Sequence, residues 1–459
     1  MNPITKFWSL VESQPDSLAL VSPRVQMSYR ELGENVARFA GVLRRRGVKR
    51  GDVIGFKTHP ELETVLILST LQLGATSLSI SSQVLEGYRQ HINQVISPDE
   101  QFMRELGMVQ PVTQPEPLAS DDVVRVSFSS GTTGMPKAIP FSVSTLLPRT
   151  ESVRKNWLVE DPFMSLLGLE TVTGILAYYW SIFNGRPFFI NTNAKLNLEL
   201  IANHKVRSIQ TSPAKLKDLI FEQQRQNLEL ELEHVYTAGS MATPSLVKLA
   251  TEVLGCQVFS VYGSTEVGSA SIGPFDEEEP NSLGRLVFDV DLQIVDEELE
   301  VLPPGSIGEI RYRKPAMPTE YWFGQSVAKN GFSDGWFYPG DRGKVTESGV
   351  LILEGRNDDL VNSGGSKFNL AQLDLWLADS GLFEDVASFT ETDQTGETLI
   401  GIVFVSDQKP DPETLISSLK NFLPTLKLSK MFAVDAIPRN KMDKVDRVAI
   451  QQLIQENRA

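Results

Sequence analysis

An early segment of the chain, residues 27–48, carries apolar side chains at helical spacing. Between residues 27 and 48 these positions run from Leu32 to Leu43, the pattern of an amphipathic helix. Ser28 precedes the repeat and Glu31 follows three residues later, which is the sequence pattern of a capping box. We therefore predict a helix that starts just after Ser28 and covers a core with one face.

Further along, short strand patterns alternate with helical ones. Residues 97–122 are rich in proline, glutamine and acidic side chains and indicate a connection, whereas 123–128 (VVRVSF) alternates like a strand. Helices are then predicted over 195–204, 213–223 and 243–254, and strands within 206–212, 234–240 and 257–264. This alternation is typical of a parallel sheet with helices on both faces.

From Leu283 onward the strand patterns follow one another without helices between them. The runs 285–296, 308–313 and 343–355 predict a small antiparallel sheet or barrel. After Asn357 a compact α+β segment begins, with helices expected over 370–381 and 411–423. The change of pattern places a domain boundary near residues 357–358.

Length and charge narrow the class of protein. A chain of 459 residues is too long for one simple core, so two or more domains are expected. Its content of 41% hydrophobic and 22% charged residues is that of an ordinary globular protein. The net charge of −15 argues against a general nucleic-acid binder, because phosphate binding needs a basic surface.

The cysteine content and the apolar segments limit the cellular compartments in which we expect the protein. The single cysteine, Cys256, excludes an intramolecular disulfide and a cysteine metal cluster, and the four histidines are scattered. The N-terminus has no apolar stretch long enough for a signal peptide, and the most apolar segment, 174–183, is too short to span a bilayer. We expect a cytoplasmic protein that has no membrane span.

Residues 127–137 (SFSSGTTGMPK) form a donor-rich loop directly behind the predicted strand 123–128. Its glycines let the backbone close around a bulky group, and its hydroxyl, amide and ammonium donors suit a polyphosphate. The loop is not a Walker A loop, because only two residues separate its glycines and Ala138 follows the lysine. An exposed turn is the alternative. The predicted phosphate-binding residues here are Ser129, Ser130, Gly131, Thr132, Thr133, Gly134 and Lys137.

This loop resembles the phosphate loop of the adenylate-forming superfamily, which includes acyl-CoA synthetases, nonribosomal adenylation domains and luciferases. The family pattern is S/T-S-G-T-T-G-x-P-K-G, and the chain departs from it only at Ala138. The resemblance implies an α/β fold with a large N-terminal domain (1–357) of two α/β subdomains plus a small β-barrel. A smaller, mobile α+β lid (358–459) would follow. It also implies that the loop grips the β- and γ-phosphates of ATP, with Lys137 in a supporting role.

The segment 261–268 (VYGSTEVG) presents a hydroxyl and a carboxylate after a predicted strand. One carboxylate beside ATP phosphates suits Mg²⁺, which prefers oxygen ligands and keeps waters. The segment resembles the family motif Y-G-x-T-E. That resemblance implies that Thr265 and Glu266 act in catalysis and hold Mg²⁺, and that Tyr262 lies against adenine with Gly263 and Ser264 beside the nucleotide. A surface carboxylate after a strand is the alternative.

A second strand-ending turn, 236–241 (YTAGSM), resembles the family's glycine-rich nucleotide segment. The resemblance implies nucleotide contacts from Gly239 and Ser240, although Ala238 occupies the first glycine position. A simple turn explains the same letters.

The segment 336–345 (WFYPGDRGKV) resembles the family motif Y-x-T-G-D, although Pro339 replaces the threonine. It implies that Asp341 accepts hydrogen bonds from the ribose hydroxyls. The alternative is an ordinary Pro-Gly-Asp turn. The next family motif, in 354–365, implies that Arg356 reaches the ribose and that Asp358 is the hinge between the domains. This hinge coincides with the boundary found from the strand and helix pattern.

Near the C-terminus, 437–447 (IPRNKMDKVDR) resembles the motif P-R-x-x-x-G-K-x-x-R. It implies that Lys444 is the catalytic lysine of adenylation, where a cation offsets the charge that grows when two anions react. Asp443 replaces the usual glycine, and Lys441 is the less favoured alternative. A solvated basic tail is the bland interpretation.

The family resemblance implies a two-step reaction. ATP and a carboxylic acid give an acyl-adenylate and pyrophosphate, and a thiol then displaces AMP. The thiol belongs to coenzyme A or to the phosphopantetheine of an acyl carrier protein. Hinge motion at Asp358 would withdraw Lys444 between the two steps.

The acid itself is less defined. The segment 164–180 lacks the histidine of many acyl-CoA synthetases, and Glu170, Thr171 and Gly174 are the predicted pocket residues. Glu170 either pairs with a substrate ammonium or faces solvent. The Ser-Gly-Gly after the hinge resembles acyl- and aryl-CoA ligases more than amino-acid adenylation domains, and this resemblance favours an acyl or aryl acid. Two rivals stay open: a stand-alone amino-acid adenylation enzyme, and a catalytically silent binding homologue, suggested by Asp443 and Pro339.

Overall fold

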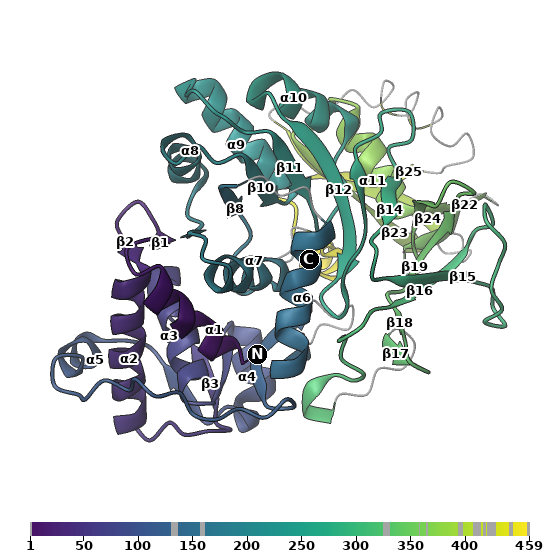
Figure 1. Ribbon diagram of the computed structural model, residues 1–459. Coiled ribbons are helices and arrows are strands. Elements are labelled where there is room, and N and C mark those ends of the chain that lie inside the picture. The colour runs from purple at the N-terminus through teal and green to yellow at the C-terminus, as the bar shows by residue number, and fades with distance from the viewer. Residues whose placement is uncertain are drawn as a thin grey trace.

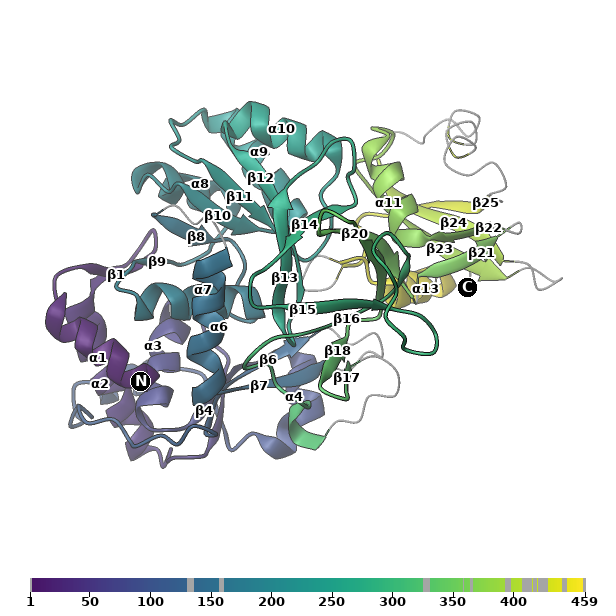
Figure 2. The same cartoon turned by 45° about the vertical axis from the view of Figure 1, so that its right-hand side comes forward.

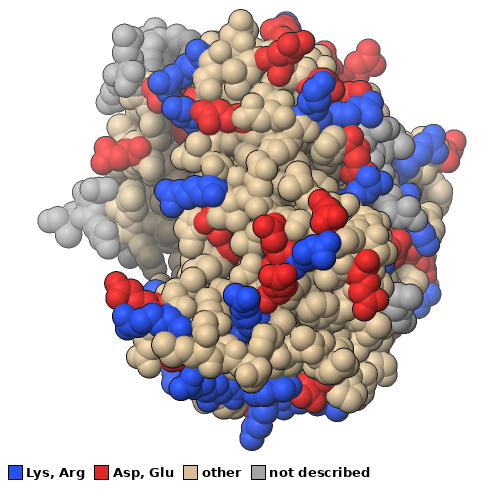
Figure 3. Space-filling view, turned by 60° about the vertical axis from the view of Figure 1, so that its left-hand side comes forward, with Lys and Arg blue, Asp and Glu red and all other residues tan. Residues whose placement is uncertain are grey.

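The structure is a computed structural model, shown in Figure 1. It describes residues 2–129, 136–156, 161–324, 331–357, 359–363, 366–392, 398–406, 415, 419, 428–439 and 444–456. Within these residues no helix is both long and apolar enough to cross a membrane. On the face shown in Figure 3, acidic and basic side chains are interspersed, so the negative net charge forms no single large patch there.

The N-terminal subdomain is a five-stranded sheet covered by helices. Its strand order is β5-β3-β4-β6-β7, parallel except for the antiparallel pair β6–β7. The predicted capping box is confirmed, because Ser28 and Glu31 exchange backbone and side-chain hydrogen bonds at the start of α2. The elements are α1 (Pro3–Ser13), α2 (Tyr29–Arg45), β3 (Val53–Phe56), α3 (Pro60–Gln72), β4 (Thr76–Ser79), α4 (Ser82–Tyr88), η1 (Arg89–His91), β5 (Gln94–Ile96), α5 (Glu100–Glu105), β6 (Val123–Ser129) and β7 (Lys137–Ser142).

Two helices, α6 (Val143–Asn156) and α7 (Val172–Phe183), lie between this subdomain and the main sheet (Figures 1 and 2). Every residue of α7 except Thr173 is buried, which fits its nearly continuous apolar sequence. A separate small sheet has the order β2-β1-β9 and pairs the N-terminal strands with a strand that follows α7. Its strands are β1 (Leu18–Val21), β2 (Gln26–Ser28) and β9 (Phe188–Phe189).

The main sheet confirms the predicted alternation of strands and helices. Its strands β8 (Phe163–Ser165), β10 (Ser208–Thr211), β11 (His234–Thr237) and β12 (Gln257–Ser264) run parallel. The helices α8 (Ala194–Asn203), α9 (Pro213–Gln226) and α10 (Pro244–Leu254) match the predicted ranges within a few residues. This sheet therefore places the carboxyl ends of β11 and β12 side by side.

The predicted antiparallel strands also form, but they continue the main sheet instead of standing apart from it. Among the described residues the order runs β17-β18-β16-β19-β20-β14-β13-β12-β11-β10-β8, with β15 paired to β16. The predicted run 285–296 divides into two strands. The antiparallel strands are β13 (Gly268–Pro274), β14 (Ser282–Leu286), β15 (Asp291–Val295), β16 (Gly308–Arg313), β17 (Gly331–Ser333), β18 (Trp336–Tyr338), β19 (Asp341–Val345) and β20 (Val350–Arg356), and η2 (Trp322–Gly324) precedes β17.

The C-terminal part is a smaller α+β unit, as predicted. It comprises the hairpin β21 (Leu360–Ser363) and β22 (Ser366–Asn369), helix α11 (Leu370–Asp379), the sheet β23 (Asp385–Thr392), β24 (Thr398–Val405) and β25 (Leu428–Ala433), and helix α13 (Arg447–Glu456). Most of the helix predicted over 411–423 lies outside the described residues, and α13 was not predicted. Hydrogen bonds from Lys217 to the Glu384 carbonyl and from the Ser245 amide to Asp379 join this part to α9 and α10.

Candidate active site

A cavity opens where strand ends of both large sheets meet α6, α7 and the C-terminal part. Strand β6 contributes Ser129, and β12 with its following turn contributes the residues from Gly263 to Gly268. The C-terminal part contributes Lys444. Residues more than three hundred positions apart in the sequence therefore line one space.

The predicted phosphate loop connects β6 to β7 beside this cavity. Its two ends, Ser129 and Lys137, pair across the hairpin and both line the cavity. The Lys137 ammonium lies 5.2 Å from the centre of the Tyr321 ring, and partial burial lowers the pKa of this lysine while Glu266 opposes the shift. The other predicted loop residues, Ser130, Gly131, Thr132, Thr133 and Gly134, lie outside the described residues.

The turn after β12 holds the predicted metal-binding pair, Thr265 and Glu266. Glu266 is only 6% exposed, and one of its oxygens accepts a 3.1 Å hydrogen bond from the Tyr321 hydroxyl. The carbonyl of Thr265 accepts a 2.8 Å hydrogen bond from Arg149. Both residues line the cavity, so the Glu266 carboxylate, held by Tyr321, faces the same space as Lys137 and Lys444. This donor set fits Mg²⁺.

The predicted ribose-binding residues lie on neighbouring strands. Asp341 begins β19 and pairs in register with Arg356 at the end of β20; the guanidinium Nε is 3.5 Å from the carboxylate. Tyr262 donates a 2.6 Å hydrogen bond to the other Asp341 oxygen. Burial raises the pKa of Asp341, and Arg356, Lys444 and the tyrosine hydroxyl oppose that shift. Tyr262 is buried behind the cavity wall, which its neighbours Val261 and Gly263 line.

Lys444 extends from the C-terminal part into the same cavity. The Lys444 side chain is accessible from the open space of the cavity, and the other lining residues surround it. Burial lowers the pKa of Lys444, and the carboxylates of Asp341 and Glu266 act against that lowering. The neighbouring predicted residues Asp443 and Lys441 lie outside the described residues.

The charges of the cavity contrast with those of the whole chain. Its cationic lining residues are Lys137, Arg149, Lys314, Arg356 and Lys444, and its carboxylates are Glu266, Asp289 and Asp341. Among the described residues, five cations against three carboxylates give this space an excess of positive charge, although the chain carries a net charge of −15. Such a concave basic site favours a polyanionic ligand.

Comparison with known proteins agrees with this geometry. The sequence profile of the family described as AMP-binding enzyme matches residues 7–95 and 81–322. The chain belongs to the AMP-binding enzyme family. The predicted superfamily is thus confirmed.

Relatives extend the match beyond that profile. The chain is 26% identical to 2-succinylbenzoate–CoA ligase of Geobacillus sp. (strain WCH70), with 96% of each chain covered. It is 24% identical to tyrocidine synthase 2 of Brevibacillus parabrevis, but there 98% of the chain covers 13% of the relative. The Bacillus subtilis O-succinylbenzoate coenzyme A synthetase, solved in complex with ATP and magnesium ion, has a TM-score of 0.84 at 20% identity over 97% and 99% of the two chains. This likeness confirms the predicted α/β fold with a large N-terminal part and a smaller C-terminal domain.

The glycine-rich turn of this AMP-binding enzyme also lies at the cavity. Gly239 follows β11 in a left-handed conformation (φ +99°), a conformation that glycine adopts without steric cost. Ala238 and Gly239 line the cavity, whereas Ser240 lies beside it and is outside its lining. The alanine at the family's first glycine position is thus accommodated.

The segment predicted to form the acyl pocket reaches the cavity through different residues from those expected. Glu170 is exposed, and Thr171 caps α7 by accepting a 3.0 Å hydrogen bond from the Gly174 amide. A Cβ at Gly174 would lie 2.1 Å from the Gly168 carbonyl oxygen, so this glycine permits close backbone packing. The cavity is instead lined by Val172, Thr173 and Leu176 from the same segment.

The lining residues that belong to no motif and were not predicted include Tyr321, Lys314 and Arg149. Tyr321 binds Glu266, as described above. Lys314 donates to Ser152 (2.8 Å) and to the Ser269 carbonyl (3.1 Å), and its ammonium is 2.9 Å from Asp289. Arg149 stacks over the Phe141 ring at 4.3 Å. Their positions follow from tertiary packing, and no local sequence signal marks them.

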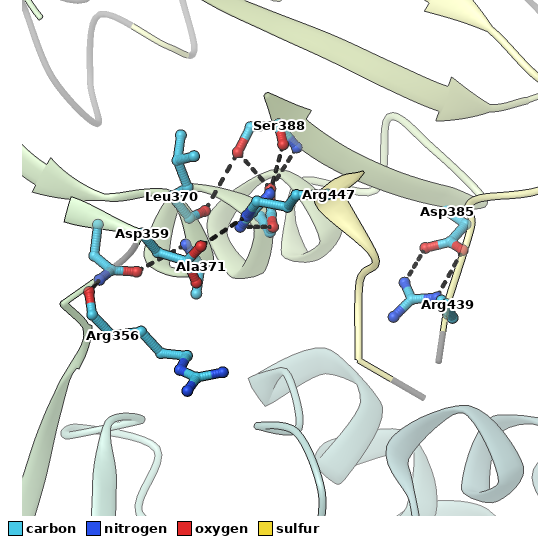
Figure 4. A network of polar contacts seen from close by, with 10 residues as sticks. Arg356, Asp359, Leu370, Ala371, Asp385, Ser388, Arg439 and Arg447 are labelled. Carbon is cyan, nitrogen blue, oxygen red and sulfur yellow. Dashed lines mark hydrogen bonds and ion pairs between the residues drawn. The ribbon is translucent and has the colours of Figure 1, made fainter. Parts of the chain in front are cut away.

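A second charged network lies beside the predicted hinge (Figure 4). Arg447 contacts Asp359 (3.0 Å), Asp374 (2.7 Å) and the Ser388 carbonyl (2.5 Å). In Figure 4 the Arg356 side chain points away from this network, and its backbone carbonyl accepts a hydrogen bond from Asn369. The predicted hinge residue, Asp358, lies outside the described residues. Near it in the sequence, Arg356 pairs with Asp341 of the large part, whereas Asp359 pairs with Arg447 of the C-terminal part.

Proposed function

We propose that this AMP-binding enzyme uses ATP to activate a small carboxylic acid as an acyl-adenylate and then transfers the acyl group to coenzyme A. The observation that carries the proposal is the presence of Lys444 in one cavity with Lys137, Glu266 and Asp341. This set provides a cation for the reacting centre, a cation for phosphates, a metal-binding carboxylate and a ribose acceptor. The enzyme is thus an AMP-forming acid–thiol ligase.

In the first step a carboxylate oxygen of the acid attacks the α-phosphorus of ATP, and the bond from that phosphorus to pyrophosphate breaks. Lys444 offsets the negative charge that accumulates as the two anions approach, and Lys137 holds the leaving phosphates. Asp341 accepts hydrogen bonds from the ribose hydroxyls, and Arg356 lies beside it. Thr265 and Glu266 would hold Mg²⁺, which neutralises phosphate charge when bound.

In the second step a thiolate attacks the acyl carbonyl, and AMP leaves. Lys444 has no role in this step. The proposed units are 1–357 and 358–459, with Asp358 as the pivot that removes Lys444 from the cavity. Supporting this pivot, Arg356 pairs with Asp341 of the large part, whereas Asp359 pairs with Arg447 of the C-terminal part. Two residues near the pivot are therefore held by separate units.

We assign an aryl or short acyl acid as the substrate. The apolar side chains of Val172, Leu176 and Val261 line the cavity and supply a surface for a ring or a short chain. A relative matched from end to end is named a CoA ligase, which favours coenzyme A over an acyl carrier protein as acceptor. An amino-acid substrate is less well supported, because Glu170, the carboxylate considered for its ammonium, is exposed and outside the cavity lining.

The decisive experiment is a panel of benzoates, short fatty acids and amino acids, with ATP-dependent pyrophosphate release measured with and without coenzyme A. We expect release with aryl or short acyl acids, and thioester formation only when coenzyme A is present. Turnover of amino acids alone would reject the proposed substrate class. Failure of every acid would favour the silent binding homologue.

A further inference from the structure

Arg149 is a buried cation whose hydrogen-bonding capacity is largely unused. It lies on α6, is 5% exposed and lines the cavity. One guanidinium nitrogen, Nη2, donates to the Thr265 carbonyl at 2.8 Å, while Nε and Nη1 have no hydrogen-bond partner among the described residues. The Phe141 ring covers one face of the group. A buried charge with so few partners is costly, so its presence calls for a compensating anion.

The charged group that attracts Arg149 is Glu266. Burial lowers the pKa of Arg149 to about 10, and the charge of Glu266 opposes that shift more strongly than Tyr312 does. Lys314 is a further cation that interacts with Arg149, but it has its own carboxylate, Asp289, at 2.9 Å. The negative charge of Glu266 therefore serves Arg149 as well as any metal ion that binds there.

This sharing has opposite consequences for a bare metal ion and for a metal–nucleotide complex. A divalent cation alone at Glu266 would be repelled by the fixed guanidinium charge. A cation that arrives with a triphosphate brings excess negative charge, which the same guanidinium attracts. The low dielectric of a buried site strengthens both effects relative to water.

We propose that Arg149 is a positioning residue that makes Glu266 selective for a metal–nucleotide complex over a free divalent cation. Its hydrogen bond to the Thr265 carbonyl holds the Thr265–Glu266 turn in place. Its positive charge interacts with the Glu266 carboxylate until phosphates bind. The inference rests on the proposed role of Glu266 in binding Mg²⁺.

The test measures binding of MnCl₂ alone, by the loss of the free Mn²⁺ electron paramagnetic resonance signal, and of MnATP in the absence of any acid. Arg149→Gln removes the charge, Arg149→Lys keeps it, and Lys155→Gln removes an exposed charge on the same helix. We expect R149Q to bind free Mn²⁺ about tenfold more tightly than wild type and MnATP about tenfold more weakly. R149K and K155Q should remain within about threefold of wild type for both ligands.

Unchanged or weaker Mn²⁺ binding by R149Q would overturn the inference. If R149Q does not fold, the wild type alone decides. The inference then requires weak binding of free Mn²⁺, and tight binding that is lost in Glu266→Gln would overturn it. These outcomes are separate from the proposed function, which stands or fails on acyl-adenylate formation by the wild type.

Discussion

The Tyr262 hydroxyl donates a 2.6 Å hydrogen bond to Asp341, the carboxylate that we propose binds the ribose. Burial raises the pKa of Asp341, and Arg356, Lys444 and this tyrosine donor oppose that rise. A residue expected to lie against adenine thus supports the group that would hold the sugar. The relationship spans two strands of the main sheet, β12 and β19, that are not adjacent in its order.

Replacing Tyr262 by phenylalanine should weaken nucleotide binding. A hydrogen bond to a charged group contributes about 1.5 kcal/mol or more, so the KM for ATP should rise roughly tenfold while kcat changes little. Steady-state pyrophosphate release measures both constants. Tyr178→Phe is the matched control, because it removes a buried hydroxyl whose partner is the Thr64 carbonyl, away from the cavity. Equal KM values for Y262F and wild type would show that the hydrogen bond has no role in nucleotide binding.

Lys444→Ala should separate the two half-reactions. Loss of the cation at the reacting centre should slow acyl-adenylate formation by about a hundredfold or more. Transfer of a supplied acyl-adenylate to coenzyme A should continue, because Lys444 takes no part in that step. Lys430→Ala, an exposed lysine of the same C-terminal part, should leave both steps unchanged. Loss of both half-reactions in K444A would contradict the proposed pivot.

The adenylation rate should fall at alkaline pH because of Lys444. Only its protonated form carries the required charge, and burial lowers its pKa although Asp341 and Glu266 oppose the shift. The rate should therefore decline as pH rises through a pKa below that of an ordinary lysine. Lys444→Arg, which keeps its proton to higher pH, should move the decline upward. Pyrophosphate exchange measured between about pH 7 and 10 tests this, and identical profiles for the two proteins would reject the assignment.

Arg447→Met should destabilise the C-terminal part far more than Arg439→Met. Arg447 forms ion pairs with Asp359 and Asp374, and burial raises the pKa of Asp374. Loss of the guanidinium leaves two poorly solvated carboxylates without this partner, at a cost of about 3 kcal/mol in the free energy of unfolding. Arg439 forms a more accessible 2.7 Å pair with Asp385 (Figure 4), which should contribute at most about 1 kcal/mol. Urea denaturation compares the two variants. Similar midpoints would mean that the Arg447 network is energetically no different from a surface pair.

Most helices and strands of the large part, and the family, could be predicted from local patterns and motifs. Local spacing predicts an element when it depends on residues only a few positions apart. This holds for the cap at Ser28 and Glu31, the strand in 123–128 and the helices near 195–254. The motif letters marked Lys137, Glu266, Asp341 and Lys444 one by one. Each could be found without knowing where the others lie.

How these residues come together depends on the three-dimensional fold. The order of the sheet brings Tyr262 to Asp341, and the seating of the C-terminal part brings Lys444 into their cavity. The direction of α7 presents Thr173 and Leu176 to the cavity and leaves Glu170 exposed, which the letters of that segment did not reveal. Arg149 belongs to no motif, and the effect that we propose for it depends on its burial and on its hydrogen bond to the Thr265 carbonyl. Burial and proximity depend on contacts between distant segments, and the linear chain does not contain those distances.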